Sequence, residues 1–224
     1  MRSKVKKLPT SNDLGSTVIH YMPQIAEQLS IKGLDVVAWL AGVGLDETCL
    51  TKPGYEVPVS TYGALLERAI ELTGDSGFGL KLGCNLTPSA HGNVGLAALA
   101  ANTIQDSMQI IETYIPLRTS LLSIRSETVN DTFRVVFEPM PGLGDVGNVV
   151  AEIALGTVKN VIDATVANGS PCQRVLFSMP EPAHAALARE LLGCEVLYGQ
   201  SWTGMSFNYS EVLSPLSHRD ALVM

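Results

Sequence analysis

The residue types that carry most enzyme chemistry are present in this chain, but their spacing assembles no known catalytic motif. The histidines are too far apart for the H-x-x-x-H or H-E-x-x-H spacing that holds zinc, and no C-x-x-C pair or G-x-S-x-G turn occurs. These histidines are His20, His91, His184 and His218. We therefore predict no catalytic residue, no metal site and no cofactor.

One glycine-rich segment, Gly142-Leu-Gly144-Asp-Val-Gly147, matches the G-x-G-x-x-G pattern of dinucleotide sites. Such a site places its first glycine directly at the end of a strand in a parallel βαβ unit. Here two prolines intervene, and the acidic residue about 20 positions on, Asp163, falls within a predicted helix. The segment is better interpreted as a loop that leads into a helix.

The segment around His91 is a candidate for ligand binding. His91 lies in a glycine-bounded turn before a helix, where the N–H groups of the first residues, Asn93 among them, could receive an anion. The simpler interpretation is a partly exposed turn histidine. The sequence leaves both open.

Three further side chains complete the candidate ligand site. Arg118 ends a predicted helix, where its charge stabilises the helix C-terminus or its guanidinium pairs with a ligand carboxylate. Tyr114 lies one turn earlier. Trp202 stands in a Gly/Ser-flanked loop, from which it could line a pocket mouth or cap the core. The predicted ligand-binding residues are thus His91, Asn93, Tyr114, Arg118 and Trp202.

The elements that must position these residues are mostly helical in the first half of the chain. A polar loop is predicted over 45–57. Apolar residues recur at helical spacing on either side of it, in 14–30, 34–41 and 58–73.

Two adjoining segments at the middle of the chain carry the candidate residues. Thr103, with Asp106 three residues on, begins a helix whose apolar face extends to Ile115. Before it, residues 92–101 are almost all Gly, Ala, Leu and Val. Because small side chains let another backbone approach closely, we expect this segment to be buried centrally.

After residue 120 the pattern changes to alternation. Residues 121–128 and 132–138 predict a hairpin, followed by a long helix at 146–167 and a final series of short strands around a helix at 182–192. The second strand should bury Phe133, Val135 and Phe137 and expose Arg134, Val136 and Glu138. The predicted fold class is α+β, with a helical N-terminal half and then a small, mostly antiparallel sheet with helices packed on one face.

Composition limits the class of protein. The chain has 224 residues, of which 46% are hydrophobic, enough for a sizeable core. No apolar run approaches a membrane span and no secretory signal is recognisable, so we expect a cytoplasmic protein without a membrane partner. The net charge of −7, with no basic stripe, opposes direct contact with nucleic acid.

The order and spacing of several short motifs resemble the N-terminal effector-sensing domain of AraC/XylS-type bacterial transcription regulators. The resemblance is closest to the subgroup related to ornithine-utilisation regulators, whose domain is described as arabinose-binding-like. It covers nearly all of residues 15–217. The segments that carry it are Val57-Pro58, 71–75, 78–83, 92–95, Thr103-Ile104, 175–180, 192–196, Phe207-Asn208 and 213–215.

This resemblance implies a division of the chain and of its function. It implies a flexible basic tail over 1–13, an effector-sensing and dimerisation domain over 14–217, and at 218–224 the start of a linker to an absent helix-turn-helix domain. DNA contact would belong to that absent domain alone. The effector would be a small metabolite, with an amino acid or a related compound as one candidate.

The mechanism implied is a population shift, in which the effector binds between helices and sheet and favours one arrangement of the domain or its homodimer. An exposed apolar face of the 146–167 helix is the expected dimer contact. Two alternatives stay open: a dimerisation module without a ligand, and a stand-alone small-molecule enzyme.

Overall fold

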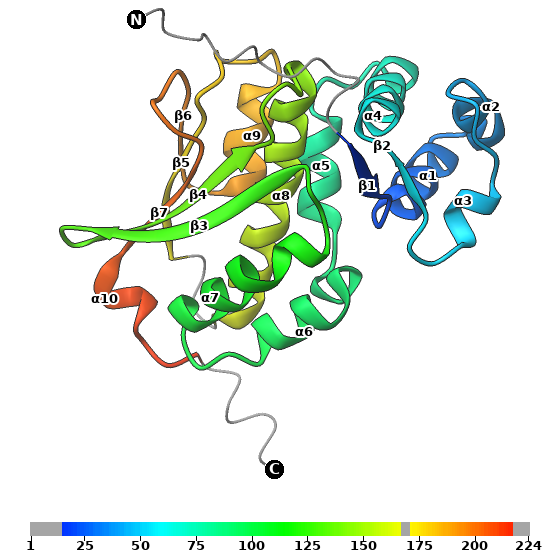
Figure 1. The fold of residues 1–224 in the computed structure, drawn as a ribbon. Helices are drawn as coiled ribbons and strands as arrows, with labels where there is room; N and C mark the ends of the chain where they lie inside the picture. Colours follow the sequence, from blue (N-terminus) through cyan, green and yellow to red (C-terminus); the bar gives the residue numbers. More distant parts are fainter. Residues whose placement is uncertain (1–14, 167–170, 217–224) are drawn as a thin grey trace, which may run out of the picture.

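The computed structural model describes residues 15–166 and 171–216. A smaller N-terminal part lies beside a larger part in which a sheet packs on helices (Figure 1). The smaller part contains β1 (Ser16–Val18), α1 (Met22–Ile31), α2 (Val36–Ala41), α3 (Thr48–Thr51), β2 (Glu56–Pro58) and α4 (Val59–Thr73).

The larger part begins with a helical segment and continues with the sheet. The helical segment contains α5 (Phe78–Asn85), η2 (Pro88–His91), α6 (Gly92–Leu99), α7 (Ile104–Tyr114) and η3 (Ile115–Leu117). The elements that follow are β3 (Leu122–Val129), β4 (Thr132–Pro139), α8 (Asp145–Thr165), β5 (Cys172–Leu176), α9 (Ala185–Leu192), β6 (Glu195–Leu197), β7 (Gly204–Asn208) and α10 (Tyr209–Val212).

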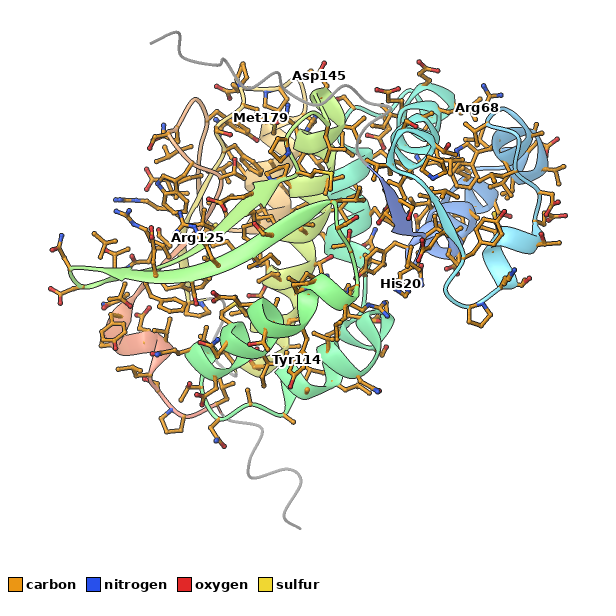
Figure 2. All side chains as sticks on the ribbon, viewed as in Figure 1. His20, Arg68, Tyr114, Arg125, Asp145 and Met179 are labelled. Atoms are coloured by element: carbon orange, nitrogen blue, oxygen red, sulfur yellow. The ribbon has the colours of Figure 1, made fainter. Side chains whose placement is uncertain are left out.

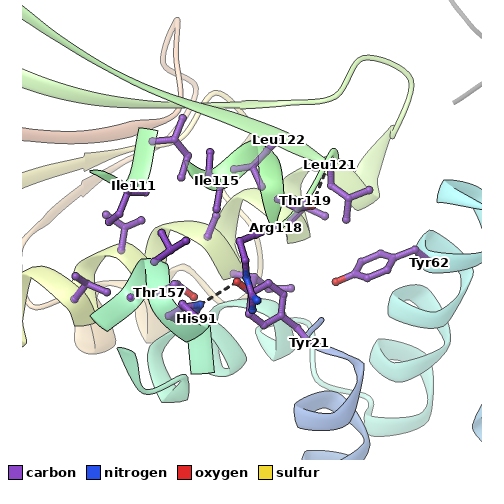
Figure 3. Close-up of a pocket in the computed structure, with 18 residues that line it drawn as sticks. Tyr21, Tyr62, His91, Ile111, Ile115, Arg118, Thr119, Leu121, Leu122 and Thr157 are labelled. Atoms are coloured by element: carbon purple, nitrogen blue, oxygen red, sulfur yellow. Dashed lines mark hydrogen bonds between the residues drawn. The ribbon is translucent and has the colours of Figure 1, made fainter. Parts of the chain in front are cut away.

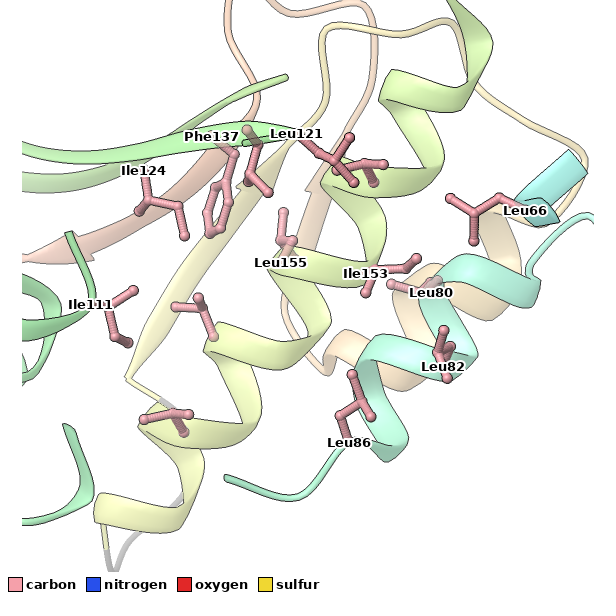
Figure 4. Close-up of a cluster of buried hydrophobic side chains, with 14 of the residues drawn as sticks. Leu66, Leu80, Leu82, Leu86, Ile111, Leu121, Ile124, Phe137, Ile153 and Leu155 are labelled. Atoms are coloured by element: carbon pink, nitrogen blue, oxygen red, sulfur yellow. The ribbon is translucent and has the colours of Figure 1, made fainter. Parts of the chain in front are cut away.

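The sheet has the strand order β3-β4-β7-β5-β6, and only the β5–β6 pair is parallel. Phe133 on β4 lies opposite Phe207 on β7, and both side chains are buried. Helix α8 lies against this sheet, with Leu155 turned toward Phe137 (Figure 4). The predicted α+β class, with a helical first half and a mostly antiparallel sheet, is confirmed.

The predicted start of the Thr103 helix is also confirmed. The Thr103 hydroxyl accepts a hydrogen bond from the Asp106 N–H at 3.0 Å, and Ile104, Met108 and Ile111 are buried. Helix α4 ends as predicted at Gly74, which adopts the left-handed conformation with φ of 61°. Local signals thus located these two helix ends correctly.

The first predicted helix, 14–30, is wrong at its beginning. Residues 16–18 form β1 instead, and the helix begins at Met22 with Pro23 in its first turn, where a missing N–H costs nothing. The predicted loop 45–57 likewise contains α3 and part of β2. Strand β2 pairs with β1 through Thr17 opposite Val57, a contact between distant segments that neither segment signals alone.

The expected central burial of residues 92–101 is also wrong. Helix α6 lies at the surface, and Leu96 is 52% exposed. Its small residue Gly95 has a local purpose, because a Cβ there would lie 2.0 Å from the Pro88 carbonyl oxygen. The small side chain permits the tight turn from η2 into α6.

Helix α8 is the central element instead, and it buries 13 of its 21 residues. It contacts α5 backbone to backbone: a Cβ on Gly83 would lie 2.3 Å from the Ile153 carbonyl oxygen, and one on Gly156 would lie 2.8 Å from the Cys84 nitrogen. The expected exposed dimer face on 146–167 is therefore wrong, because the chain's own sheet and helices cover it.

The outer face of the sheet departs from the prediction at one position. Val136 is only 2% exposed, although the alternation placed it in solvent. It pairs with Gly204, whose open side is covered by the ring of Trp202. The guanidinium of Arg134 also lies over that ring, 5.4 Å from its centroid. Trp202 therefore caps the outer face of the sheet.

Candidate functional site

A cavity lies where the N-terminal part, helices α6 to α8 and the beginning of β3 meet. The volume of this cavity is about 70 Å³. Figure 3 shows its walls, with Tyr62 approaching from α4 and Arg118 in the middle. The lining residues are Tyr21, Tyr62, His91, Val94, Gly95, Ile111, Ile115, Arg118, Thr119, Leu121, Leu122, Ile124, Val150, Ile153, Ala154, Thr157, Val158 and Val161.

Most of this lining is aliphatic. Helix α7 with η3 supplies one wall, the first residues of β3 another, and α8 a third. None of the lining residues is an Asp, Glu or Lys. The cavity therefore resembles the general form of small-molecule sites, which are mainly apolar with a few polar groups that fix orientation.

The polar groups that contact one another are three side chains from three separate segments. The Tyr21 hydroxyl and the His91 Nδ1 atom are 2.9 Å apart. The guanidinium of Arg118 lies over the Tyr21 ring, 5.8 Å from its centroid, and its Nη2 donates to the Ala90 carbonyl oxygen at 3.4 Å. We call Tyr21, His91 and Arg118 the polar cluster.

The chain conformation on both sides explains how the cluster forms. Helix α7 ends in the η3 turn, which contains Pro116 and brings Arg118 toward η2. Gly92 has φ of 59°, and a Cβ there would lie 3.6 Å from Nη1 of Arg118. A glycine therefore suits the left-handed backbone turn after His91, whereas the guanidinium would be in ordinary contact with a Cβ at this position.

Burial sets the protonation of the cluster. Burial, reinforced by the positive charge of Arg118, lowers the pKa of His91 to about 4, so the imidazole is neutral at neutral pH. Burial raises the pKa of Tyr21, although Arg118 opposes this shift. Arginine remains charged under all ordinary conditions. The cluster thus presents one positive charge and two neutral hydrogen-bonding groups.

Several polar atoms at the cavity lack a partner. The Nε2 atom of His91, the Nε atom of Arg118 and the Oγ1 atom of Thr157 are buried without a hydrogen bond. No Asp or Glu among the described residues lies within ion-pair distance of Arg118. Because buried polar groups are normally satisfied, these atoms mark a place where a ligand can supply the missing partners.

The structure brings together two of the five residues that the sequence proposed. His91 and Arg118 both line the cavity. Asn93 points to solvent, and Tyr114 on α7 is 47% exposed (Figure 2). Trp202 caps the outer face of the sheet. These three do not line the cavity.

Sequence reasoning missed Tyr21, Tyr62 and Thr157 as lining residues. The two tyrosines fit the apolar faces of the predicted helices, so nothing set them apart from core residues. A hydroxyl on such a face is nevertheless a usable signal, because a buried tyrosine requires a polar partner. Burial raises the pKa of Tyr62, which is 4% exposed.

The described residues contain neither a candidate metal site nor a candidate membrane-spanning helix. They contain no group of three or more His, Cys, Asp or Glu side chains that could hold a metal ion. Within the same ranges, no helix combines the length and apolar composition that crossing a bilayer requires.

Comparison with known proteins assigns the chain to a family. Residues 33–216 match the family model described as the arabinose-binding domain of AraC transcription regulator, N-terminal. The chain belongs to this family of AraC-type domains. The family consists of transcription regulators rather than enzymes, as we expected from the absence of catalytic motifs.

Individual relatives agree with this assignment. The chain is 30% identical over 173 residues to an ornithine utilization regulator of Pseudomonas aeruginosa, covering 75% of this chain and 50% of that protein. The crystal structure of the transcriptional regulator CdpR from Pseudomonas aeruginosa has a similar fold, with a TM-score of 0.61 at 17% identity. That match covers 88% of this chain and 57% of CdpR. The chain thus spans about half the length of these two proteins.

Proposed function

We propose that this AraC-type domain binds a small effector in the cavity and thereby controls DNA binding by a further domain of the regulator. The observation that carries the proposal is the polar cluster, with its unpartnered atoms, inside an otherwise apolar cavity. The family role as a ligand-sensing domain agrees with it. His91 and Arg118 remain the proposed ligand-binding residues, and we add Tyr21, Tyr62 and Thr157.

The position of the cavity gives the proposed effector a mechanical consequence. Tyr21 and Tyr62 belong to the N-terminal part, whereas Arg118 and Ala154 belong to the larger part. A ligand between them contacts both and favours the arrangement in which these contacts coexist. It can shift the equilibrium only by the difference of its affinities for the two arrangements.

We further propose that the regulator is a cytoplasmic homodimer. With α8 buried, the exposed apolar residues Leu96 on α6, Tyr114 on α7 and Leu117 on η3 offer a more suitable contact surface. Leu117 directly precedes Arg118, so a second copy at this surface would adjoin the cavity. Sedimentation analysis of the wild type and of Leu117→Ser tests this contact. If the dimer is held there, the variant should dissociate into monomers at a higher protein concentration than the wild type does.

Thermal denaturation against a panel of sugars, amino acids, organic acids and amines tests effector binding. A ligand that binds only the native state raises the melting temperature by mass action. Ala154→Leu, which fills the cavity, is the control and should abolish any shift. If no compound shifts the wild type, or if shifts persist unchanged in Ala154→Leu, the cavity is not the effector site. The alternative of a dimerisation module without a ligand then stands.

A further inference from the structure

From the charge and the lining of the cavity, we infer that its ligand is a monocarboxylate with an apolar body, rather than a sugar or an amino acid. This inference rests on the proposed function, because it names the chemical class of the effector. It departs from the compounds after which the family and one relative are named, arabinose and ornithine.

The first argument is the charge of Arg118. Its guanidinium is half-buried, and its one hydrogen bond to a carbonyl oxygen leaves the Nε atom without a partner. A cation that is partly withdrawn from water and has no counter-charge gains from a bound anion, and an arginine binds a carboxylate through two parallel hydrogen bonds. A ligand carboxylate at this end therefore supplies the negative charge that the described residues do not.

The second argument is the hydrogen-bonding capacity of His91 and Tyr21. If the Tyr21 hydroxyl donates to Nδ1, the neutral imidazole carries its proton on Nε2, which is buried and unpartnered. If Nδ1 donates instead, the Tyr21 hydroxyl proton becomes available. Either tautomer leaves one donor beside Arg118 for a carboxylate oxygen. The cluster thus matches one anionic group.

The third argument is that the cavity lining contains no carboxylate and few polar side chains. An amino acid would bring an ammonium group beside Arg118, and no lining residue is a carboxylate that could pair with it. A sugar would bring hydroxyl groups around its whole ring. The side chains of Ile111, Leu122 and Val158 in the walls cannot form hydrogen bonds with them. Polar groups left unpaired in such surroundings oppose binding. The aliphatic walls favour a hydrocarbon body.

Calorimetric titration with matched probes tests the inference on the whole chain. Octanoate, octanol and octylamine have similar apolar bodies and differ in the head group, and arabinose and ornithine are the compounds after which the family and one relative are named. We expect octanoate to bind at least about tenfold more tightly than octanol, as a charge-assisted hydrogen bond allows. Affinity should also rise about fourfold per methylene from acetate to butanoate and then level off, because a cavity of about 70 Å³ encloses only the first few methylene groups. Octylamine, arabinose and ornithine should not bind measurably.

Two arginine variants assign the effect to the polar cluster. Arg118→Met should weaken octanoate binding by about 10- to 100-fold and leave octanol binding unchanged. Arg125→Met is the control, because Arg125 lies on the outer face of the sheet and pairs with Glu127 and Glu138. It should bind octanoate like the wild type. If Arg118→Met does not fold, the comparison of octanoate with octanol on the wild type still decides.

The outcomes separate this inference from the proposed function. Equal binding of octanoate and octanol, or tighter binding of arabinose or ornithine that Ala154→Leu abolishes, would overturn the carboxylate assignment and retain the effector site. Unchanged octanoate binding in Arg118→Met would also overturn the assignment. Failure of every probe class to bind would reject both.

Discussion

The two faces of helix α8 pack in opposite ways. Toward α5, the backbones touch: Gly83 and Gly156 sit where any Cβ would collide with the neighbouring main chain. Toward α7 and β3, the same helix leaves a cavity beside Ala154 and Thr157. One rigid element therefore shows both close packing and open space within two turns.

The polar groups on the two faces differ in the same way. On the closed side, the Glu152 carboxylate lies 2.6 Å from the His184 Nε2 atom, so this carboxylate has its ionisable partner within the chain, although the Nδ1 atom of His184 is buried without a hydrogen bond. On the open side, Arg118 has no carboxylate partner among the described residues. Because the helix packs tightly elsewhere, the cavity is not a general looseness of the core. The difference supports our proposal that the effector binds at the open face.

The strongest test of the closed face is Gly83→Ala. The new Cβ would lie 2.3 Å from the Ile153 carbonyl oxygen, and neither backbone can yield easily. We expect a loss of about 3 kcal/mol in the free energy of unfolding, measured by chemical denaturation. Gly63→Ala on α4 is the control: its Cβ finds 3.5 Å of room, and the gain should be about 0.5 kcal/mol or more. Similar effects in both would contradict the close packing.

The second test is the pH dependence set by His91, which contacts Tyr21 and Arg118. Its folded pKa of about 4 lies below the ordinary 6.5, so the unfolded chain takes up the proton first and stability falls as the pH falls between these values. At about pH 5 the loss should reach about 2 kcal/mol relative to neutral pH, and His91→Gln should lack it. Identical pH profiles would contradict the burial of a neutral imidazole. His20→Gln measures the share of His20 in the same pH range, because burial and Arg118 lower the pKa of that imidazole as well.

The third test compares two threonines on α8. The Thr157 hydroxyl is unpartnered at the cavity, whereas the Thr165 hydroxyl donates to the Ile162 carbonyl oxygen at 2.6 Å. Thr157→Val should raise the free energy of unfolding by about 1 kcal/mol, and Thr165→Val should lower it by about the same amount. A loss in Thr157→Val would show that its hydroxyl is satisfied in the unliganded chain.

The last test, Ala154→Leu, is directed at ligand binding rather than at stability. Its added side chain enters existing space, so the free energy of unfolding should change by less than about 1.5 kcal/mol. Octanoate binding, measured by calorimetry, should nevertheless be lost. A large destabilisation would instead show that the open face has no room for a ligand.

Local chemistry in the sequence predicted much of the fold. Thr103 and Gly74 located helix ends, and the turn at Asn130, with φ of 54°, connects the predicted hairpin. The pattern also placed Phe133 and Phe137 in the core. It failed where burial depends on distant segments, as for Val136, which lies beneath the Trp202 cap, and for Gly95, whose small size serves a local turn.

The candidate site shows the same difference between residues with a local sequence signal and residues placed by distant contacts. His91 and Arg118 each carried a local signal, a glycine-bounded turn and a charged helix end. Tyr21 carried none, because its partner His91 is 70 residues away along the chain. Asn93, Tyr114 and Trp202 shared the local signals of turn, helix end and loop, yet the structure directs them elsewhere.

The sequence by itself determined the elements, the family resemblance and the absence of catalytic motifs, because propensities, caps and motif spacing depend on near neighbours. Only the tertiary structure decided which face of α8 stays closed and which surrounds a cavity. That choice depends on how α5, α7 and β3 pack against one helix, and on where Arg118 lies without a carboxylate partner among the described residues.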